Sequence, residues 1–162
     1  MNNFTEAFGA KFAENKDSLR IRTFTLGDHT FKVKVPLTVE TDAIYERVKT
    51  PDDNKAKAYY ENLSKEFLDN KEKFANDKDI EFKENDILIR GLSLLETAKN
   101  KVLTENRIVE MIRLLVPENK DFDMSTVTYA EIDELFPFSI QLELLEEINL
   151  AISPNYSANR GK

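Results

Sequence analysis

Residues 20–36 read RIRTFTLGDHTFKVKVP, and this stretch decides the fold class of the N-terminal region. Apolar and polar residues alternate before and after Gly27-Asp28, which is the pattern of two half-buried strands joined by a two-residue turn. The implied register pairs Phe24 with Phe31 and places threonines and lysines on the opposite face. Because a two-stranded ribbon is marginally stable alone, we expect this hairpin to pack on the remainder of the chain. The predicted strands cover residues 20–26 and 29–35.

Helical periodicity follows the hairpin in five segments. Apolar residues recur every three or four positions, and prolines stand at several of the breaks. Thr128 and Glu131 form the pattern of a capping box at the start of one segment, and Pro117 ends the longest one. The predicted helices cover residues 38 or 41 to 50, 51–74, 92 or 93 to 116, 128–135 and 138–152. In the first of them, the residues expected to face inward are Val39, Ala43, Ile44 and Val48.

Residues 79–90 read DIEFKENDILIR and predict a second small hairpin. The alternative is that Ile87–Ile89 already belongs to the following helix, because a short apolar run is compatible with a strand or a helix. Inside that helix, Thr104–Arg107 form a polar island, for which we expect a solvent-facing turn. A buried polar network or a partner contact is the alternative interpretation of the island.

Together these segments predict a mainly helical α+β fold, in which the N-terminal hairpin packs on a bundle of four to five helices. The length of 162 residues suits a single domain over 1–162. Residues 1–17 carry Phe4, Phe8 and Phe12 on one helical face, which fits either a docked helix or an arm that orders on a partner. Residues 154–162 are polar and are expected to form a flexible tail.

Composition excludes several classes of function. The chain has 23 Lys and Arg against 30 Asp and Glu, a net charge of -7, which disfavours binding to nucleic acid. It has no Cys and only one His, so thiolate zinc sites, Cys nucleophiles and two-histidine metal sites are excluded within one chain. Its four Gly are isolated, which excludes phosphate loops and dinucleotide fingerprints. Neither a signal peptide nor a membrane helix is indicated.

No catalytic constellation, metal site or cofactor is predicted. His29 stands beside the hairpin turn without a nucleophile in a suitable context, so we expect a polar residue flanking the turn. The acidic clusters near Glu131 and Glu143 are expected to be solvated helix faces, because carboxylate-bridged metal bundles also need histidines. The chain is therefore expected not to be an enzyme.

The most informative segment is Phe136-Pro137-Phe138, which continues into a helix that is apolar on most sides. Such a helix is either buried within the monomer or engaged by a partner. Aromatic and aliphatic anchors in a patch with few charges are typical of protein interfaces. We therefore predict partner contacts in this helix first and on the apolar hairpin face second. The predicted contact residues are Phe136, Phe138, Ile140, Leu144, Ile148, Phe24 and Phe31.

Three blocks of the sequence resemble the tail assembly chaperones of long-tailed, siphovirus-type (lambda-like) bacteriophages. The first is RTFTLGDHTFKVKVPLTVETDAIYERV, at residues 22–48. The second is ILIRGLSLLETAKNKVLTENRIVEMIRLLVP, at residues 87–117. The third is YAEIDELFPFSIQLELLEEINLAISPNY, at residues 129–156. None of these blocks is a catalytic signature.

The resemblance implies a non-enzymatic assembly factor in the host bacterial cytoplasm, absent from the mature virion. It implies two partners, the tape-measure protein and the tail-tube protein, and no nucleic acid or membrane; self-association is left open. Members of this family are made in a short form and a frameshift-extended form, and Gly161-Lys162 is compatible with a slippery codon stretch. The alternatives are a tail-completion or connector subunit of the virion and an acidic nucleic-acid mimic that inhibits a host protein.

Overall fold

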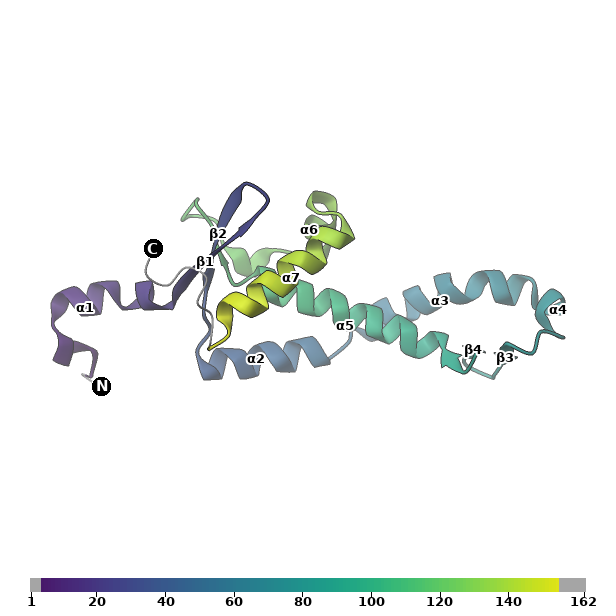
Figure 1. Cartoon of the computed structure of the whole chain (residues 1–162). Coiled ribbons are helices and arrows are strands. Elements are labelled where there is room, and N and C mark those ends of the chain that lie inside the picture. The colour runs from purple at the N-terminus through teal and green to yellow at the C-terminus, as the bar shows by residue number, and fades with distance from the viewer. Residues whose placement is uncertain (1–3, 155–162) are drawn as a thin grey trace. The chain divides into compact units, whose positions relative to one another are not determined.

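The computed structural model describes residues 4–154, so the Gly161-Lys162 pair and nearly all of the predicted C-terminal tail lie outside the described residues. Helices account for 61% of the structure and strands for 15%, which confirms the mainly helical α+β fold (Figure 1). The chain divides into two compact units. Unit 1 contains the residues up to Ala43 and those from Ile108 onward, and unit 2 runs from Ile44 to Arg107. Folding as a single domain stays a prediction.

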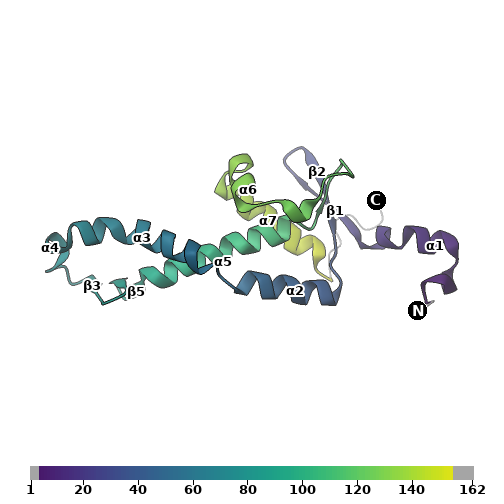
Figure 2. The same cartoon turned by 180° about the vertical axis from the view of Figure 1, so that it is seen from behind.

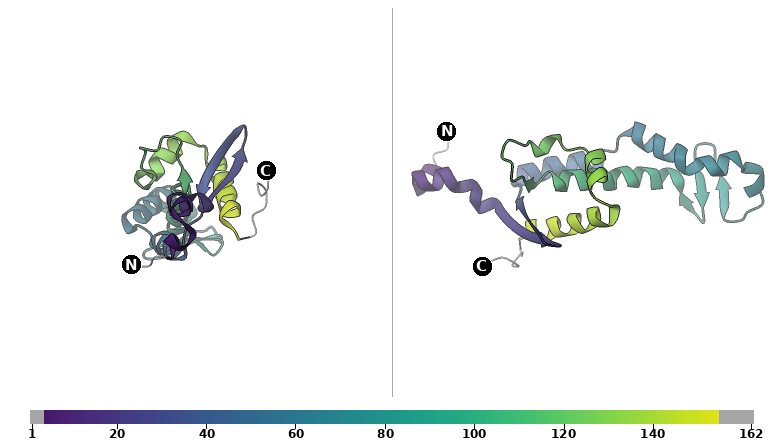
Figure 3. Two further views of the ribbon diagram at one scale, coloured as in Figure 1. Left: turned by 90° about the vertical axis from the view of Figure 1, so that its left-hand side faces the viewer. Right: turned by 90° about the horizontal axis from the view of Figure 1, so that it is seen from above.

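The N-terminal hairpin of unit 1 has the predicted register. Strand β1 (Ile21–Leu26) pairs antiparallel with β2 (His29–Lys34), and Phe24 lies opposite Phe31 with their rings 5.4 Å apart. Gly27 has a φ of 60°, the backbone conformation that the first position of a tight two-residue turn requires. The apolar face of the hairpin packs on helix α7 (Phe138–Ile152), as Figures 1 and 3 show. The contact with α7 supplies the burial that a two-stranded hairpin lacks on its own.

A third strand extends this sheet and corrects the predicted helix over 93–116. Helix α5 (Leu94–Ile112) ends at Ile112, and β6 (Leu115–Val116) pairs with the free edge of β2. Two physical causes combine here. The residue before Pro117 is sterically disfavoured in the helical region, and the open edge of β2 offers unpaired backbone groups. The tertiary contact therefore prevails over the helical periodicity of these residues.

The core of unit 1 lies between the sheet and the C-terminal helices. The N-terminal segment consists of η1 (Thr5–Phe8), α1 (Ala10–Asn15) and η2 (Lys16–Arg20), and the C-terminal half contains η3 (Met124–Thr126), α6 (Tyr129–Leu135) and α7. Arg22 donates to the carbonyls of Ala151 at 2.7 Å and Ser153 at 2.5 Å, which ties β1 to the end of α7. The buried apolar residues are Phe24, Val33, Ile108, Met111, Ile112, Val127, Ile132, Leu144, Ile148 and Ala151.

Helix α2 (Thr38–Lys49) forms where predicted, but its inward residues were predicted only in part. Ile44 is buried and Val48 is half-buried. Val39 and Ala43 are exposed, so their predicted inward orientation was wrong. The cause is helix geometry. At about 100° per residue, Ala43 lies about 100° and Val39 about 140° from Ile44 around the helix, so neither shares the face of Ile44.

Unit 2 contains two long helical stretches and a small sheet. Helix α3 (Asp53–Asp69) begins with Asp52, whose carboxylate accepts from two backbone N–H groups, and Asn70 separates α3 from α4 (Lys71–Phe74). The second hairpin is confirmed: β3 (Ile80–Phe82) pairs with β4 (Ile87–Ile89), which also pairs with β5 (Leu92–Ser93) (Figure 2). The buried apolar residues are Ile44, Ala56, Ile87, Leu94, Ala98 and Val102.

The polar island in α5 forms a buried contact, which corrects the expected solvent-facing turn. The side chain of Glu105 is 5% exposed, and both its oxygens lie within 2.7 Å of the Tyr59 hydroxyl. Lys101 lies over the Tyr59 ring, 4.2 Å from its centroid. Asn106 donates to the carbonyls of Val48 and Thr50. The island therefore joins α3 and α5 through polar contacts.

Asp86 organises the start of α5. Its carboxylate accepts from Ile87 N–H at 2.7 Å, from Leu95 N–H at 3.0 Å and from the Ser93 hydroxyl. Burial by itself raises the pKa of Asp86, but the hydrogen bonds from Ser93, Leu95 and Ile87 and the nearby Lys83 ammonium outweigh it. The pKa of this carboxyl therefore lies below its ordinary value of 3.8.

This lowered pKa gives an acid-dependent prediction for Asp86→Asn. Since the folded-state pKa is below the unfolded one, the carboxylate stabilises the fold above about pH 4, and that stabilisation is lost as the pH falls through the folded-state pKa. We expect the variant to unfold about 1 to 2 kcal/mol more easily at pH 7, and the difference to shrink at acid pH. Urea unfolding followed by circular dichroism, from neutral pH to about pH 2, measures both effects.

Asp69→Asn is the matched control, because the Asp69 side chain is exposed and forms no hydrogen bond or ion pair within residues 4–154. Its unfolding free energy should change by less than about 0.5 kcal/mol at either pH. An Asp86→Asn variant that follows wild type at every pH contradicts the role assigned to this carboxylate.

Candidate protein-binding groove

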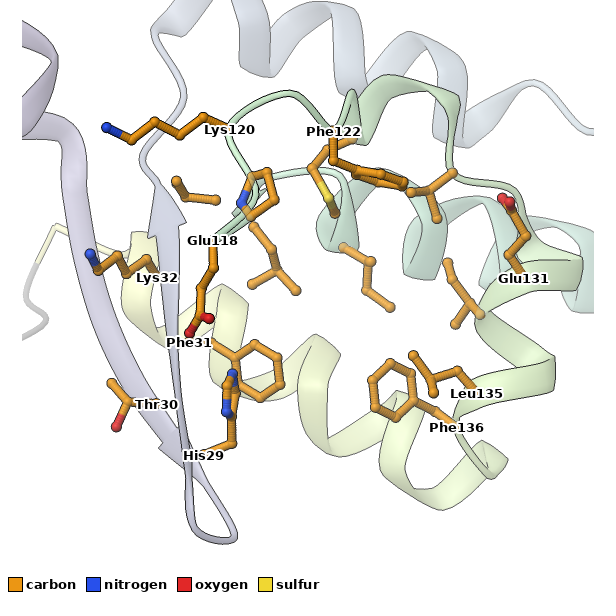
Figure 4. Close-up of a pocket in the computed structure, with 17 residues that line it drawn as sticks. His29, Thr30, Phe31, Lys32, Glu118, Lys120, Phe122, Glu131, Leu135 and Phe136 are labelled. Carbon is orange, nitrogen blue, oxygen red and sulfur yellow. The ribbon is translucent and has the colours of Figure 1, made fainter.

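An apolar cavity of about 700 Å³ opens on unit 1 (Figure 4). Its walls come from β2, the end of α5, β6, the loop after Pro117, and α6. We call this cavity the groove. Its lining residues are His29, Thr30, Phe31, Lys32, Ile112, Leu115, Val116, Pro117, Glu118, Lys120, Phe122, Met124, Val127, Glu131, Ile132, Leu135 and Phe136.

The groove is built from residues that belong to separate parts of the sequence. Phe31 of β2 stands on one wall, and Leu135 and Phe136 stand on the facing wall at the end of α6 (Figure 4). Ile112, Val127 and Ile132 are buried and form part of the apolar lining. A concave apolar surface of this volume is typical of ligand and peptide sites.

The rim of the groove carries both signs of charge. Lys32, Lys120 and Glu118 lie at one side of the cavity, and Glu131 lies at the other (Figure 4). His29 packs its ring edge-on against Phe31, with the centroids 4.5 Å apart, so the structure places it beside the turn as predicted and also at the groove. Glu131 accepts from Thr128 N–H at 2.7 Å and completes the predicted capping box, so its carboxylate has a structural role.

Two sets of hydrogen bonds hold the loop after Pro117 and helix α6, which form part of the groove wall. The capping box starts α6 directly after the loop. Asp123 accepts from the hydroxyl of Ser125 at 2.6 Å and from Ser125 N–H at 2.9 Å, which fixes the turn that follows Phe122. The hydroxyl and then the N–H of Ser125 hold the pKa of Asp123 below its ordinary range, so this turn keeps its acceptor charged above acid pH.

Gln141 fixes the corner between α6 and α7. Its side chain is fully buried, and its amide nitrogen donates to the Phe136 carbonyl at 2.8 Å and to Asp133 at 3.0 Å. Its amide oxygen accepts from the Tyr129 hydroxyl at 2.9 Å. A buried polar side chain with this many partners orders the backbone around it. Gln141 therefore positions Phe136 in the groove wall.

The predicted contact residues separate into three groups. Phe31 and Phe136 line the groove. Phe138 is 53% exposed and Ile140 half-buried, and neither lines it. Three others lie in the core of unit 1, where the hairpin and α7 cover each other and leave these side chains at most 2% exposed, which corrects the prediction that they contact a partner. The three core residues are Phe24, Leu144 and Ile148.

Sequence reasoning missed three residues that matter for the groove. Leu135 is 71% exposed at the end of α6, and Phe122 is exposed in the loop that follows Pro117. A leucine at the last position of a short amphipathic helix, next to an aromatic, was the available signal for Leu135. Gln141 had no such signal, because a single glutamine in an apolar helix is equally compatible with a solvent-facing position.

The structure offers no constellation for metal chemistry and no long apolar helix in the part of the chain it describes. Within residues 4–154, no three His, Asp or Glu side chains are grouped so as to hold a metal ion. Over the same residues, no helix has both the length and the apolar character needed to cross a bilayer. The groove is therefore the candidate site that the described residues present.

Comparison of the chain with protein-family models, with curated proteins and with solved structures found no match in any of the three. The candidate site therefore rests on its own geometry and chemistry.

Proposed function

We propose that this protein is a non-enzymatic tail assembly chaperone of a long-tailed bacteriophage. In this proposal it acts in the host bacterial cytoplasm, where it binds apolar helical segments of the tape-measure protein, shields them, and helps to recruit tail-tube subunits. It leaves before the tail is finished. The resemblance of three sequence blocks suggests the class of partner.

The observation that carries the proposal is the apolar groove of unit 1, with exposed Leu135 at its wall. An amphipathic helix presents a row of apolar side chains every three to four residues, and grooves of this kind accept such rows. Exposed apolar area on a soluble protein marks association surfaces. The net charge of -7 supports the proposal, because it would keep a complex with an apolar filament dispersed.

The test is capture of purified fragments of a phage tape-measure protein. Leu135→Asp places a carboxylate at the groove wall on an exposed position, so the fold is retained and apolar contact is lost. We expect the dissociation constant to rise by at least about tenfold, the loss typical of one interface anchor. Isothermal titration calorimetry with purified fragments measures it.

Leu150→Asp is the matched control, because Leu150 is 50% exposed on α7 and does not line the groove. It should bind as wild type does. If Leu135→Asp and Leu150→Asp bind the fragments equally well, the groove is not the binding site. The salt dependence separates the acidic-mimic alternative: apolar shielding changes little with salt, whereas binding to a basic cleft weakens steeply.

Mass spectrometry of purified phage particles tests the remaining alternative. A chaperone that leaves during assembly should be missing from finished particles. A fixed copy number per particle would instead identify a structural connector subunit and overturn the proposal.

A further inference from the structure

The N-terminal segment of unit 1 exposes aromatic side chains in a contiguous row. The ring of Phe8 lies between two neighbours, with centroids 5.3 Å from Phe4 and 5.1 Å from Phe12. Phe8 is 58% exposed and Phe4 is 67% exposed. We call residues 4–15 the aromatic arm. Phe12 is half-buried, so the arm offers less apolar area than the about 450 to 750 Å² that three fully accessible aromatic side chains could bury, and less than the about 800 Å² of one side of a standard interface. Any association through the arm alone is therefore expected to be weak.

The arm does not fill the groove of its own chain. No residue of the arm is among those that line the groove. The arm enters β1 at Ile21, which pairs with Lys34 at the open end of the hairpin, whereas the groove is lined from His29 at the turn end. Arg20 donates from Nε to the Val35 carbonyl at 2.9 Å and holds this entry point. The arm thus leaves the hairpin from the end opposite to the groove (Figure 1).

The arm and the groove are complementary in chemistry. The arm offers phenylalanine rings, and the groove offers Phe31, Leu135 and Phe136 on facing walls. Glu118 lies on the same side of the groove as Lys32 and Lys120 (Figure 4). Glu6, between Phe4 and Phe8 in the sequence, is the arm residue that could meet the two lysines. Within residues 4–154, neither Glu6 nor either of the two lysines forms an ion pair. The side of the groove that carries two lysines and one glutamate has a net positive charge, and Glu6 of the arm has the opposite sign.

We propose that the groove of one molecule binds the aromatic arm of a second copy of this chain. The contact joins two different surfaces, so it is head-to-tail, and copies add in series. Phe8 is the central anchor, and Glu6 faces the lysine rim. The inference uses the same groove as the proposed function but does not require the phage partner, and a bound tape-measure segment would displace the arm.

Sedimentation of the purified full-length protein tests this inference, from about 1 µM to about 1 mM, a range that covers weak self-association. The mean mass of wild type should rise steadily with concentration. Phe8→Asp removes the anchor from the arm, and Leu135→Asp alters the groove. Each variant alone should self-associate at least about 30-fold more weakly than wild type. A 1:1 mixture should form a heterodimer, because the intact arm of one fits the intact groove of the other, and nothing larger.

Two variants at exposed leucines outside both surfaces serve as controls. Leu19→Asp lies after the arm, and Leu150→Asp lies outside the groove; both should self-associate as wild type does. Circular dichroism verifies that all four variants are folded. A wild type that stays monomeric throughout, variants that associate normally, or a mixture without heterodimer each overturns the inference. Tape-measure capture is measured separately, so failure of self-association leaves the proposed function standing.

Discussion

Leu144→Asp is expected to unfold unit 1. The Leu144 side chain is 0% exposed, in the face of α7 that packs on the hairpin. Loss of the buried leucine costs about 2 to 5 kcal/mol, and a buried carboxylate without a partner adds several more. The sum approaches the whole stability of an ordinary domain, about 5 to 15 kcal/mol. Far-ultraviolet circular dichroism and urea unfolding should show lost helix and no cooperative transition for unit 1.

Leu142→Asp is the matched control on the same helix. Leu142 is 41% exposed, so the same change should cost less than about 1 kcal/mol and leave the spectrum unaltered. If Leu144→Asp unfolds with the same midpoint as Leu142→Asp, the burial of α7 against the hairpin is wrong. The contrast also explains why Leu144 is a poor probe of binding: its variant would lose partners by losing the fold.

Gln141→Leu should have the second largest effect. The leucine has a similar volume but removes the amide that donates to the Phe136 carbonyl and to Asp133 and that accepts from the Tyr129 hydroxyl. Each lost hydrogen bond costs about 1 kcal/mol, and a polar group left without a partner costs about 1 to 3. We expect about 2 to 4 kcal/mol of lost stability, measured by urea unfolding, together with weaker capture of tape-measure fragments because Phe136 is no longer held.

Asn149→Leu provides the comparison, since Asn149 lies on α7 and makes no side-chain hydrogen bond within residues 4–154. It should change the unfolding free energy by less than about 1 kcal/mol. If Gln141→Leu is as stable as wild type, the network does not hold the corner between α6 and α7. Loss of stability without loss of capture would limit Gln141 to a structural role.

Local patterns were sufficient to predict the elements whose signals are strong over short distances. The alternation around Gly27 predicted both strands and their register. Thr128 with Glu131 predicted the capping box, and the prolines at 137 and 154 bracketed α7. These features are determined by interactions between residues a few positions apart, so they can be predicted from the local sequence alone.

The short strands β5 and β6 depend on distant neighbours. Leu115–Val116 continue a helical period, and only the free edge of β2 makes them a strand. The turn before β5 needs positive φ at both central positions, 51° at Arg90 and 81° at Gly91. Gly91 suits such a turn, but arginine gives no indication of it. Local propensity and tertiary pairing disagree here, and pairing prevails.

The sequence by itself determined the fold class, the main helices, both hairpins and the surplus of apolar side chains. Only the tertiary structure decided which of those side chains are covered: Leu144 and Ile148 lie in the core, whereas Leu135 and Phe122 border an open groove. The physical reason is that periodicity identifies the apolar face of an element without identifying what packs on it. Burial depends on contacts between residues as far apart as Phe31 and Phe136, which meet only after the chain folds.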